Sequence, residues 1–138
     1  MQTADELTGT LVLVHPKLTN DPAGRNGQVG IITGADLEND NIFVGFGRSG
    51  QGVYGGDALL LLKPAEQIKE LLGQHKQELS ANDYKALFQI SLLQEFRQST
   101  ANIKTAMSLA LQNETVMGYS MQSLEDKLGL RQHQTLER

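Results

Sequence analysis

Short apolar runs rich in β-branched residues alternate with turn residues over the first 64 positions. A half-buried strand repeats its apolar positions every second residue, and Gly, Pro, Asn and Asp mark the turns between strands. The pattern predicts five strands, at 10–15, 28–33, 42–47, 53–55 and 59–62. The stretch 17–27 contains Pro22 and the Asn26-Gly27 pair, so it predicts a long loop after the first strand.

The second half of the chain changes to the apolar spacing of helices. Ile68, Leu71 and Leu72 share one helical face, which predicts a helix that begins after Pro64. Ser80 is a suitable N-cap for a second helix, whose wide apolar face predicts a central position in the helical part. That face carries Tyr84, Leu87, Phe88, Leu92 and Phe96, widened by Ile90 and Leu93.

Two shorter helices are expected toward the C-terminus. Thr100 is a suitable N-cap for a third helix, which Asn113 ends. Ser120 or Ser123 begins a fourth helix, and Gly129 is its C-cap. We expect the tail after Gly129 to fray, because it has little apolar patterning.

The change of period near residue 64 divides the chain into two domains. Five short strands with one long first loop predict a small β-barrel over 1–64, and the helices predict a bundle of three to four over 65–138. The predicted fold class is therefore α+β. Composition follows the same division, because 11 of the 14 glycines lie in 1–64 and 10 of the 13 glutamines lie in 65–138.

Four segments of the first domain, which include the glycine-spaced run Gly24–Gly30 before a β-branched strand, together match the pattern of a known class of barrel. They are 9–12 (Gly-Thr-Leu-Val), 24–32 (Gly-Arg-Asn-Gly-Gln-Val-Gly-Ile-Ile), 43–46 (Phe-Val-Gly-Phe) and 57–60 (Asp-Ala-Leu-Leu). In these segments the chain resembles the SH3-like barrels of the KOW and Tudor type. The resemblance implies a five-stranded SH3-like β-barrel, and a binding edge made by the loop with Arg25 and Asn26 and by the turn with Arg48. KOW domains often bind RNA or ribosomal and transcription components, which it implies here as well.

The charge balance argues against nucleic acid as the partner. The chain has 138 residues, with 12 Lys and Arg against 16 Asp and Glu, and its formal net charge is −4. A nucleic-acid binder gains much of its affinity from a basic surface that releases phosphate counterions. Neither domain has a basic excess, since 1–64 carries four basic and seven acidic residues. RNA binding is therefore the alternative that the resemblance implies, and a protein partner is favoured.

Several other classes are excluded by what the sequence lacks. Without Cys it has no disulfide framework, Cys nucleophile, zinc finger or iron–sulfur cluster. The longest apolar run, 58–62, is far shorter than the roughly 18 residues that cross a bilayer. The first six residues lack the basic and apolar regions of a signal peptide. We expect a cytoplasmic protein that makes no membrane contact.

No spacing of acidic, basic or nucleophilic residues indicates catalysis. His15, His75 and His133 lie in different segments, with no pair at a ligand spacing. The acidic stretch 36–41 lacks the glycine and the bidentate glutamate of an EF-hand loop, so a solvated turn is favoured. The Gly-x-Gly-x-x-Gly run at 45–50 is not followed by the helix that dinucleotide binding needs. We expect no enzyme, no metal site and no cofactor.

The third predicted strand offers a candidate contact surface. If 42–47 turns its even-numbered side chains inward, the other face presents Phe43 beside Gly45 and Gly47. The glycines either permit close approach by another element or simply allow the barrel to curve. The first interpretation predicts a docking face with Phe43 and Tyr54 as anchors.

These observations predict a non-catalytic protein–protein interaction or assembly module. The candidate binding residues are Arg25, Asn26, Phe43, Gly45, Gly47, Arg48 and Tyr54. The expected partner is another protein or a second copy of the chain, the latter through surplus apolar surface on the helices. The alternative function is an RNA- or ribosome-associated accessory protein of KOW-like type.

Overall fold

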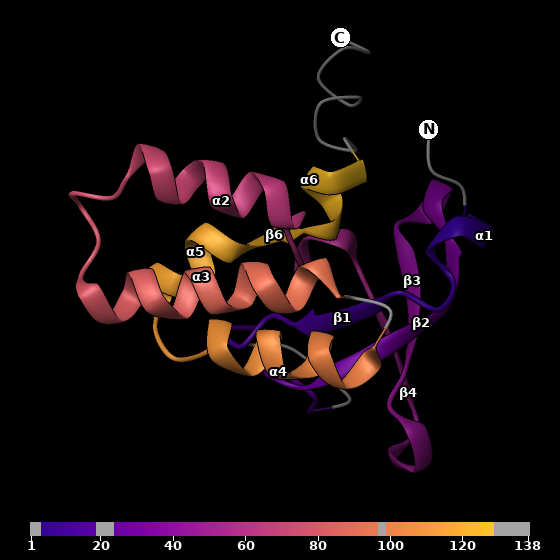
Figure 1. The fold of residues 1–138 in the computed structure, drawn as a ribbon. Helices are drawn as coiled ribbons and strands as arrows, with labels where there is room; N and C mark the ends of the chain where they lie inside the picture. Colours follow the sequence, from indigo (N-terminus) through magenta and orange to yellow (C-terminus); the bar gives the residue numbers. More distant parts are fainter. Residues whose placement is uncertain (1–3, 19–23, 97–98, 129–138) are drawn as a thin grey trace, which may run out of the picture. The chain divides into compact units, whose positions relative to one another are not determined.

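The computed structural model describes residues 4–18, 24–96 and 99–128, and the chain divides into two compact units (Figure 1). Unit 1 comprises Met1–Leu61 and Ser123–Arg138, and unit 2 comprises Leu62–Gln122. The sequence placed the boundary after residue 64 and assigned all of 65–138 to the helical domain. The structure differs in that the chain returns to unit 1 at Ser123, so the last described helix belongs with the strands.

A six-stranded antiparallel sheet dominates the N-terminal part. Its strands are β1 (Leu11–Val14), β2 (Val29–Asp36), β3 (Asn41–Gly45), β4 (Gln51–Tyr54), β5 (Leu59–Leu62) and, from later in the chain, β6 (Met121–Ser123). The short helix α1 (Ala4–Leu7) precedes β1, and α6 (Leu124–Leu128) follows β6. Three one-turn 3-10 helices connect strands, namely η1 (Leu37–Asn39), η2 (Gly47–Ser49) and η3 (Gly56–Ala58). The strand order is β4-β3-β2-β1-β5-β6, and the unit boundary runs through β5 and β6.

The sheet is open, which corrects the closed five-stranded barrel expected from the sequence. β4 lies at one end of the strand order and pairs with β3, while β6 lies at the other end. The described strands therefore form no closed ladder. The sequence did not predict β6, because this strand spans only three residues, Met121–Ser123. Its last residue Ser123 and the preceding Ser120 are both good helix N-caps, which favoured a helix. The α+β class itself is confirmed.

Apolar side chains of the strands build the core of unit 1, by alternation in β2 and β3 and as continuously buried runs in β1 and β5. Val12 and Val14 of β1 are fully buried, as are Ile32 of β2 and Ile42 and Val44 of β3. The same cluster contains Leu7, Tyr54, Ala58, Leu59, Leu61 and Leu124. Burial of one such aliphatic side chain stabilises the fold by about 1.5–3 kcal/mol. In β2 and β3, where buried and exposed residues alternate, a slip of one residue would turn Ile32, Ile42 and Val44 toward solvent, so the apolar pattern fixes their register.

The described residues of unit 2 form four helices. They are α2 (Ala65–Gln74), α3 (Ala81–Glu95), α4 (Thr100–Ala110) and α5 (Glu114–Ser120). With α6 of unit 1 there are five helices within 65–128, where the sequence predicted three to four, because α5 was not expected. α3 packs against α2, α4 and α5, so its predicted central position is confirmed. The predicted N-cap Ser80 is confirmed too, because its side chain accepts a hydrogen bond from the Asp83 amide at 3.1 Å.

Two other predicted helix boundaries are wrong. The N-cap of α4 is Ser99, whose side chain accepts from the Asn102 amide at 3.3 Å, and Thr100 is already helical. Asn113 does not end that helix. It begins α5, because its side-chain oxygen accepts from the Val116 amide at 2.9 Å.

Part of the C-terminal prediction cannot be compared with the structure. The predicted C-cap Gly129, the tail 130–138 and His133 lie outside the described residues. Across 4–18, 24–96 and 99–128, no helix has both the length and the apolar character that a bilayer span requires.

Candidate functional site

Three large apolar side chains lie exposed on one face of β2, β3 and β4. Ile31 is 42% exposed, Phe43 36% and Val53 54%. Phe43 lies opposite Val53, and Ile31 lies opposite Gly45, two residues along β3 from Phe43. Since residues two apart on a strand share a face, the three side chains point the same way. Ile31, Phe43 and Val53 are termed the sheet patch.

β4 is the edge strand of the sheet and carries Val53 of the sheet patch. The Phe46 amide donates to the Gly50 carbonyl at 2.8 Å, so Phe46 and Gly50 are a hydrogen-bonded pair of the β3–β4 hairpin. Hydrogen-bonded and non-bonded pairs alternate in an antiparallel ladder, so the N–H and C=O groups of Gln51 and Val53 point away from β3. β4 contains neither a charged residue nor proline, the residues that commonly block edge pairing. An extended segment can therefore add to this edge as a further strand.

The first loop and the turn between β3 and β4 are linked by Arg25. Its guanidinium carbon lies 5.3 Å from the centre of the Phe46 ring, and its Nη2 atom donates to a backbone carbonyl of the turn. Arg48 is exposed on the same turn. Asn26 donates from Nδ2 to the Pro16 carbonyl at 3.2 Å. The Arg25 contacts connect the two segments that the KOW resemblance assigned to a binding edge, and the binding role of Arg25, Asn26 and Arg48 stays a prediction.

The remaining predicted residues occupy three different environments. Gly45 shares the face of the sheet patch, where a Cβ atom would come 3.2 Å from Thr33 Cγ2. Gly47 lies in the η2 turn with φ of 66°, a backbone region that favours glycine, so it is a turn residue and not a strand residue. Tyr54 is buried in the core of unit 1. Of the two predicted anchors, Phe43 therefore faces solvent and Tyr54 does not.

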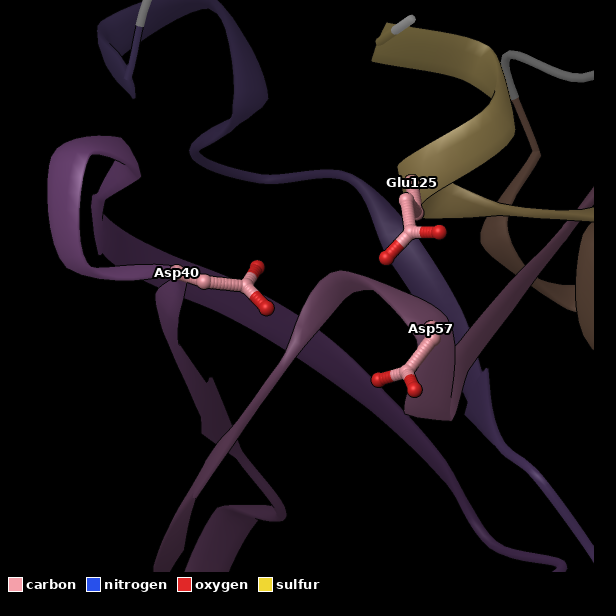
Figure 2. A group of neighbouring side chains, drawn as sticks. All are labelled: Asp40, Asp57 and Glu125. Carbon is pink, nitrogen blue, oxygen red and sulfur yellow. The ribbon is translucent and has the colours of Figure 1, made fainter. Parts of the chain in front are cut away.

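Three carboxylates from separate segments of unit 1 approach one another (Figure 2). Asp40 follows η1, Asp57 lies in η3 and Glu125 lies in the first turn of α6. One oxygen from each carboxylate lies within 4.8 Å of the other two. Figure 2 shows the side chains extending from three different elements toward a common space.

Local backbone geometry positions these carboxylates. Asp40 has φ of 55° and ψ of 42°, and its Oδ1 atom accepts from the Gly56 amide at 2.9 Å. η3 approaches α6 closely, because a Cβ atom on Gly56 would come 3.2 Å from the Glu125 amide nitrogen. Ser123 caps α6 by accepting from the Asp126 amide at 3.0 Å. The group is thus a consequence of how η1, η3 and α6 meet.

Carboxylate oxygens at this spacing are ligands that hard divalent cations such as Ca²⁺ and Mg²⁺ prefer. Exposed acidic groups also gather without an ion, so the spacing alone assigns no metal. The sequence could not indicate this group, because its members are far apart along the chain and only the fold brings them together. The sequence signal for one member was Asp40 in the acidic stretch 36–41, and that stretch favours a solvated turn over a metal site.

The two described histidines form local interactions. His15 accepts from the Lys17 amide at its Nδ1 atom, over 3.1 Å. His75 Nδ1 lies 3.0 Å from a carboxylate oxygen of Glu78, three residues along the chain. His15 is thus engaged within its own segment, whereas the His75 ring also packs against the Tyr119 ring of α5, with ring centres 5.2 Å apart.

Comparisons with protein-family models, with curated proteins and with solved structures gave no match. The function proposed below rests on this chain's own residues.

Proposed function

We propose that the chain is a non-catalytic protein–protein interaction module that binds an extended segment of a protein partner at the β4 edge. The supporting observation is that an exposed apolar patch adjoins an edge strand whose backbone groups point outward. In strand addition, backbone hydrogen bonds supply affinity and the side chains on one face supply specificity. The sheet patch and the β4 edge meet both requirements.

Phe43 is the main anchor of this surface. Phe43 and Val53 form a non-hydrogen-bonded cross-strand pair, the type in which side chains approach most closely. A segment paired with β4 places every second side chain on the face that carries Phe43 and Val53. Buried aromatic residues dominate many interfaces, so the loss of Phe43 is expected to cost about 1–2 kcal/mol of binding free energy.

The KOW resemblance supplies the alternative of an RNA- or ribosome-associated accessory protein. Two observations favour a protein partner instead. The chain carries a net charge of −4, and the Arg25 guanidinium is already engaged with Phe46 and the turn. Phosphate contacts depend on accessible cationic side chains, which are few at this edge.

Affinity capture from a native lysate with the immobilised full chain tests the proposal. Val53→Pro removes an outward-pointing backbone donor, and Phe43→Thr removes the apolar anchor while keeping a strand-forming residue. Leu111→Thr is the matched control. Leu111 lies on unit 2, and its exposed fraction of 38% is similar to the 36% of Phe43. We expect the proteins captured by the wild type and by the control to be lost with both test variants.

Nuclease treatment of the lysate separates the two functions. Circular dichroism first establishes that each variant keeps the fold. Captured proteins that disappear after nuclease, together with a salt-sensitive mobility shift of RNA by the chain, would support the KOW-like alternative. Proteins retained by all of the variants would contradict the proposed surface.

A further inference from the structure

A second apolar surface lies on unit 2, along the solvent-facing side of α3. Phe88 is 46% exposed, Leu92 39% and Phe96 62%. They are spaced four residues apart, so they share one side of α3. Phe96 is the C-cap residue that follows the helix. Leu87 and Ile90 are buried on the other side, where α3 packs against its neighbours. Phe88, Leu92 and Phe96 are termed the helix stripe.

The helix stripe departs from the usual pattern of a surface helix, whose outward face is polar. Exposed polar residues flank it at Lys85, Gln89 and Glu95. The backbone at Phe96, the most exposed of the three residues, makes two hydrogen bonds. The Phe96 carbonyl accepts from the Ser99 amide and from an amide group of Asn102, both at 3.2 Å. The stripe is therefore an exposed apolar surface flanked by polar residues of α3.

The stripe is symmetrical about its middle residue. In an antiparallel pair of α3 helices with a two-fold axis at Leu92, Phe88 of one copy lies opposite Phe96 of the other. With a rise of about 1.5 Å per residue, each Phe pair lies roughly 6 Å along the helix from the axis. A two-fold interface requires such reciprocal contacts, because the same patch serves both subunits.

The charges that flank the stripe suit the same arrangement. Lys85 lies toward the start of α3 and Glu95 at its end, so antiparallel pairing brings opposite charges to each end of the interface. Glu95 also pairs with Lys69 of α2. Opposed helix dipoles favour the antiparallel direction as well. Among the described residues of α3, the pairing thus places unlike charges at each end of the interface, although the chain carries a net charge of −4.

The size of the stripe predicts a weak dimer. Its exposed side chains amount to about 300 Å² per copy, if a whole aromatic side chain contributes about 200 Å². Two copies would bury about 600 Å² of apolar surface at the centre, whereas stable interfaces bury roughly 1,200–2,000 Å² in total. The flanking polar residues would supply the rim, so weak association is expected.

We propose that a second copy of this chain covers the helix stripe, in an antiparallel α3–α3 pair with Leu92 on the two-fold axis. This surface lies on unit 2 and the proposed partner surface lies on unit 1, so each proposal can fail alone. The variant Val53→Pro is expected to dimerise like the wild type.

Site-specific cross-linking tests the pairing, because the chain has no Cys and a single substitution introduces its one thiol. Leu92→Cys in the full chain is expected to give a covalent dimer with a short bismaleimide, since the axis places residue 92 beside its counterpart. Leu111→Cys is the matched control, as Leu111 is exposed to nearly the same extent as Leu92. Equal cross-linking at the two positions would overturn the proposal.

Mixed cross-linking tests the direction of the pair. Antiparallel pairing predicts that chains with Phe88→Cys and chains with Phe96→Cys cross-link to each other more than either does to itself. Self-linkage that exceeds mixed linkage at both positions would overturn the antiparallel register.

Sedimentation equilibrium of the unmodified chain gives an independent measurement. We expect a monomer–dimer equilibrium that Leu92→Glu weakens by at least about tenfold, because it places two carboxylates together on the axis. A wild-type chain that stays monomeric up to its solubility limit would overturn the proposal. The stripe would then be covered by the same chain or by a different protein.

Discussion

Asp40 combines an uncommon backbone conformation with a hydrogen bond to another segment. Its φ of 55° is costly for most residues with a Cβ atom, while Asp and Asn tolerate it. Its carboxylate also accepts from the Gly56 amide. We expect Asp40→Ala to lower the free energy of unfolding by about 1–2 kcal/mol, through the lost acceptor and the strained backbone. Urea denaturation measures this change.

Asp40→Asn provides the control for that experiment. Asparagine keeps an acceptor oxygen and tolerates the left-handed conformation, so its stability is expected to stay close to that of the wild type. If the Ala and Asn variants unfolded at the same urea concentration, neither feature of Asp40 would contribute as described.

Lys63 carries a pH-dependent contribution to stability. Burial disfavours its charged form and lowers the pKa of the ammonium group below the ordinary value of 10.5. Between the lowered pKa and 10.5 the unfolded chain binds more protons than the folded chain, so stability rises with pH in this window. We expect Lys63→Met to be more stable than the wild type at neutral pH, and this advantage to shrink as the pH approaches 10.5.

Thermal unfolding of both proteins across the alkaline range measures this difference. Lys104→Met, at an exposed position of α4, controls for the general effect of replacing lysine by methionine. A stability difference between Lys63→Met and the wild type that did not change with pH would contradict the role given to burial.

At the scale of elements, helix starts were predictable where one residue alone has capping chemistry. Ser80 is followed by Ala81, which cannot cap, and its prediction is confirmed. Ser99 and Thr100 are adjacent and chemically equivalent, so the sequence could not choose between them. Asn113 suits a helix end and a helix start alike, and α5 was missed because this ambiguity was resolved in favour of an end.

The capping role of Ser80 leads to a direct prediction for α3. Its side chain satisfies one of the free amides in the first turn, so Ser80→Ala is expected to cost about 1 kcal/mol of stability. Ser80→Asp keeps an acceptor and is expected to stay near the wild type. Guanidinium unfolding compares the two variants, and equal stability would contradict the cap.

Strands were predictable where turn residues delimit an apolar run, and the way in which the strands join into a sheet was not. Leu59–Leu62 was predicted with its observed bounds, because Pro64 and the glycines of 55–56 delimit a continuous apolar run. Whether β4 joins the far end of the sheet depends on contacts between distant segments, which alternation does not encode. The short β6 lacks the length at which a period-2 pattern can be recognised.

At the scale of the whole molecule, the candidate surface was predictable only in part. Phe43 followed from alternation along one strand. Ile31 and Val53 did not, because their place beside Phe43 depends on the pairing of β2 and β4 with β3. The sheet patch and the helix stripe both arise in this way. The sequence pattern assigns their side chains to strands or to a helix, and the packing of the fold leaves these side chains exposed to solvent.

Residue-resolved amide hydrogen exchange of the full chain tests the central claim most directly, with and without a captured partner. In the free chain, the outward amides of Gln51 and Val53 are expected to exchange faster than that of Gly52, which bonds to β3. Addition of the partner is expected to slow exchange at Gln51 and Val53 and to leave Gly52 unchanged. A bound partner that leaves the exchange of Gln51 and Val53 as fast as in the free chain would contradict strand addition at β4.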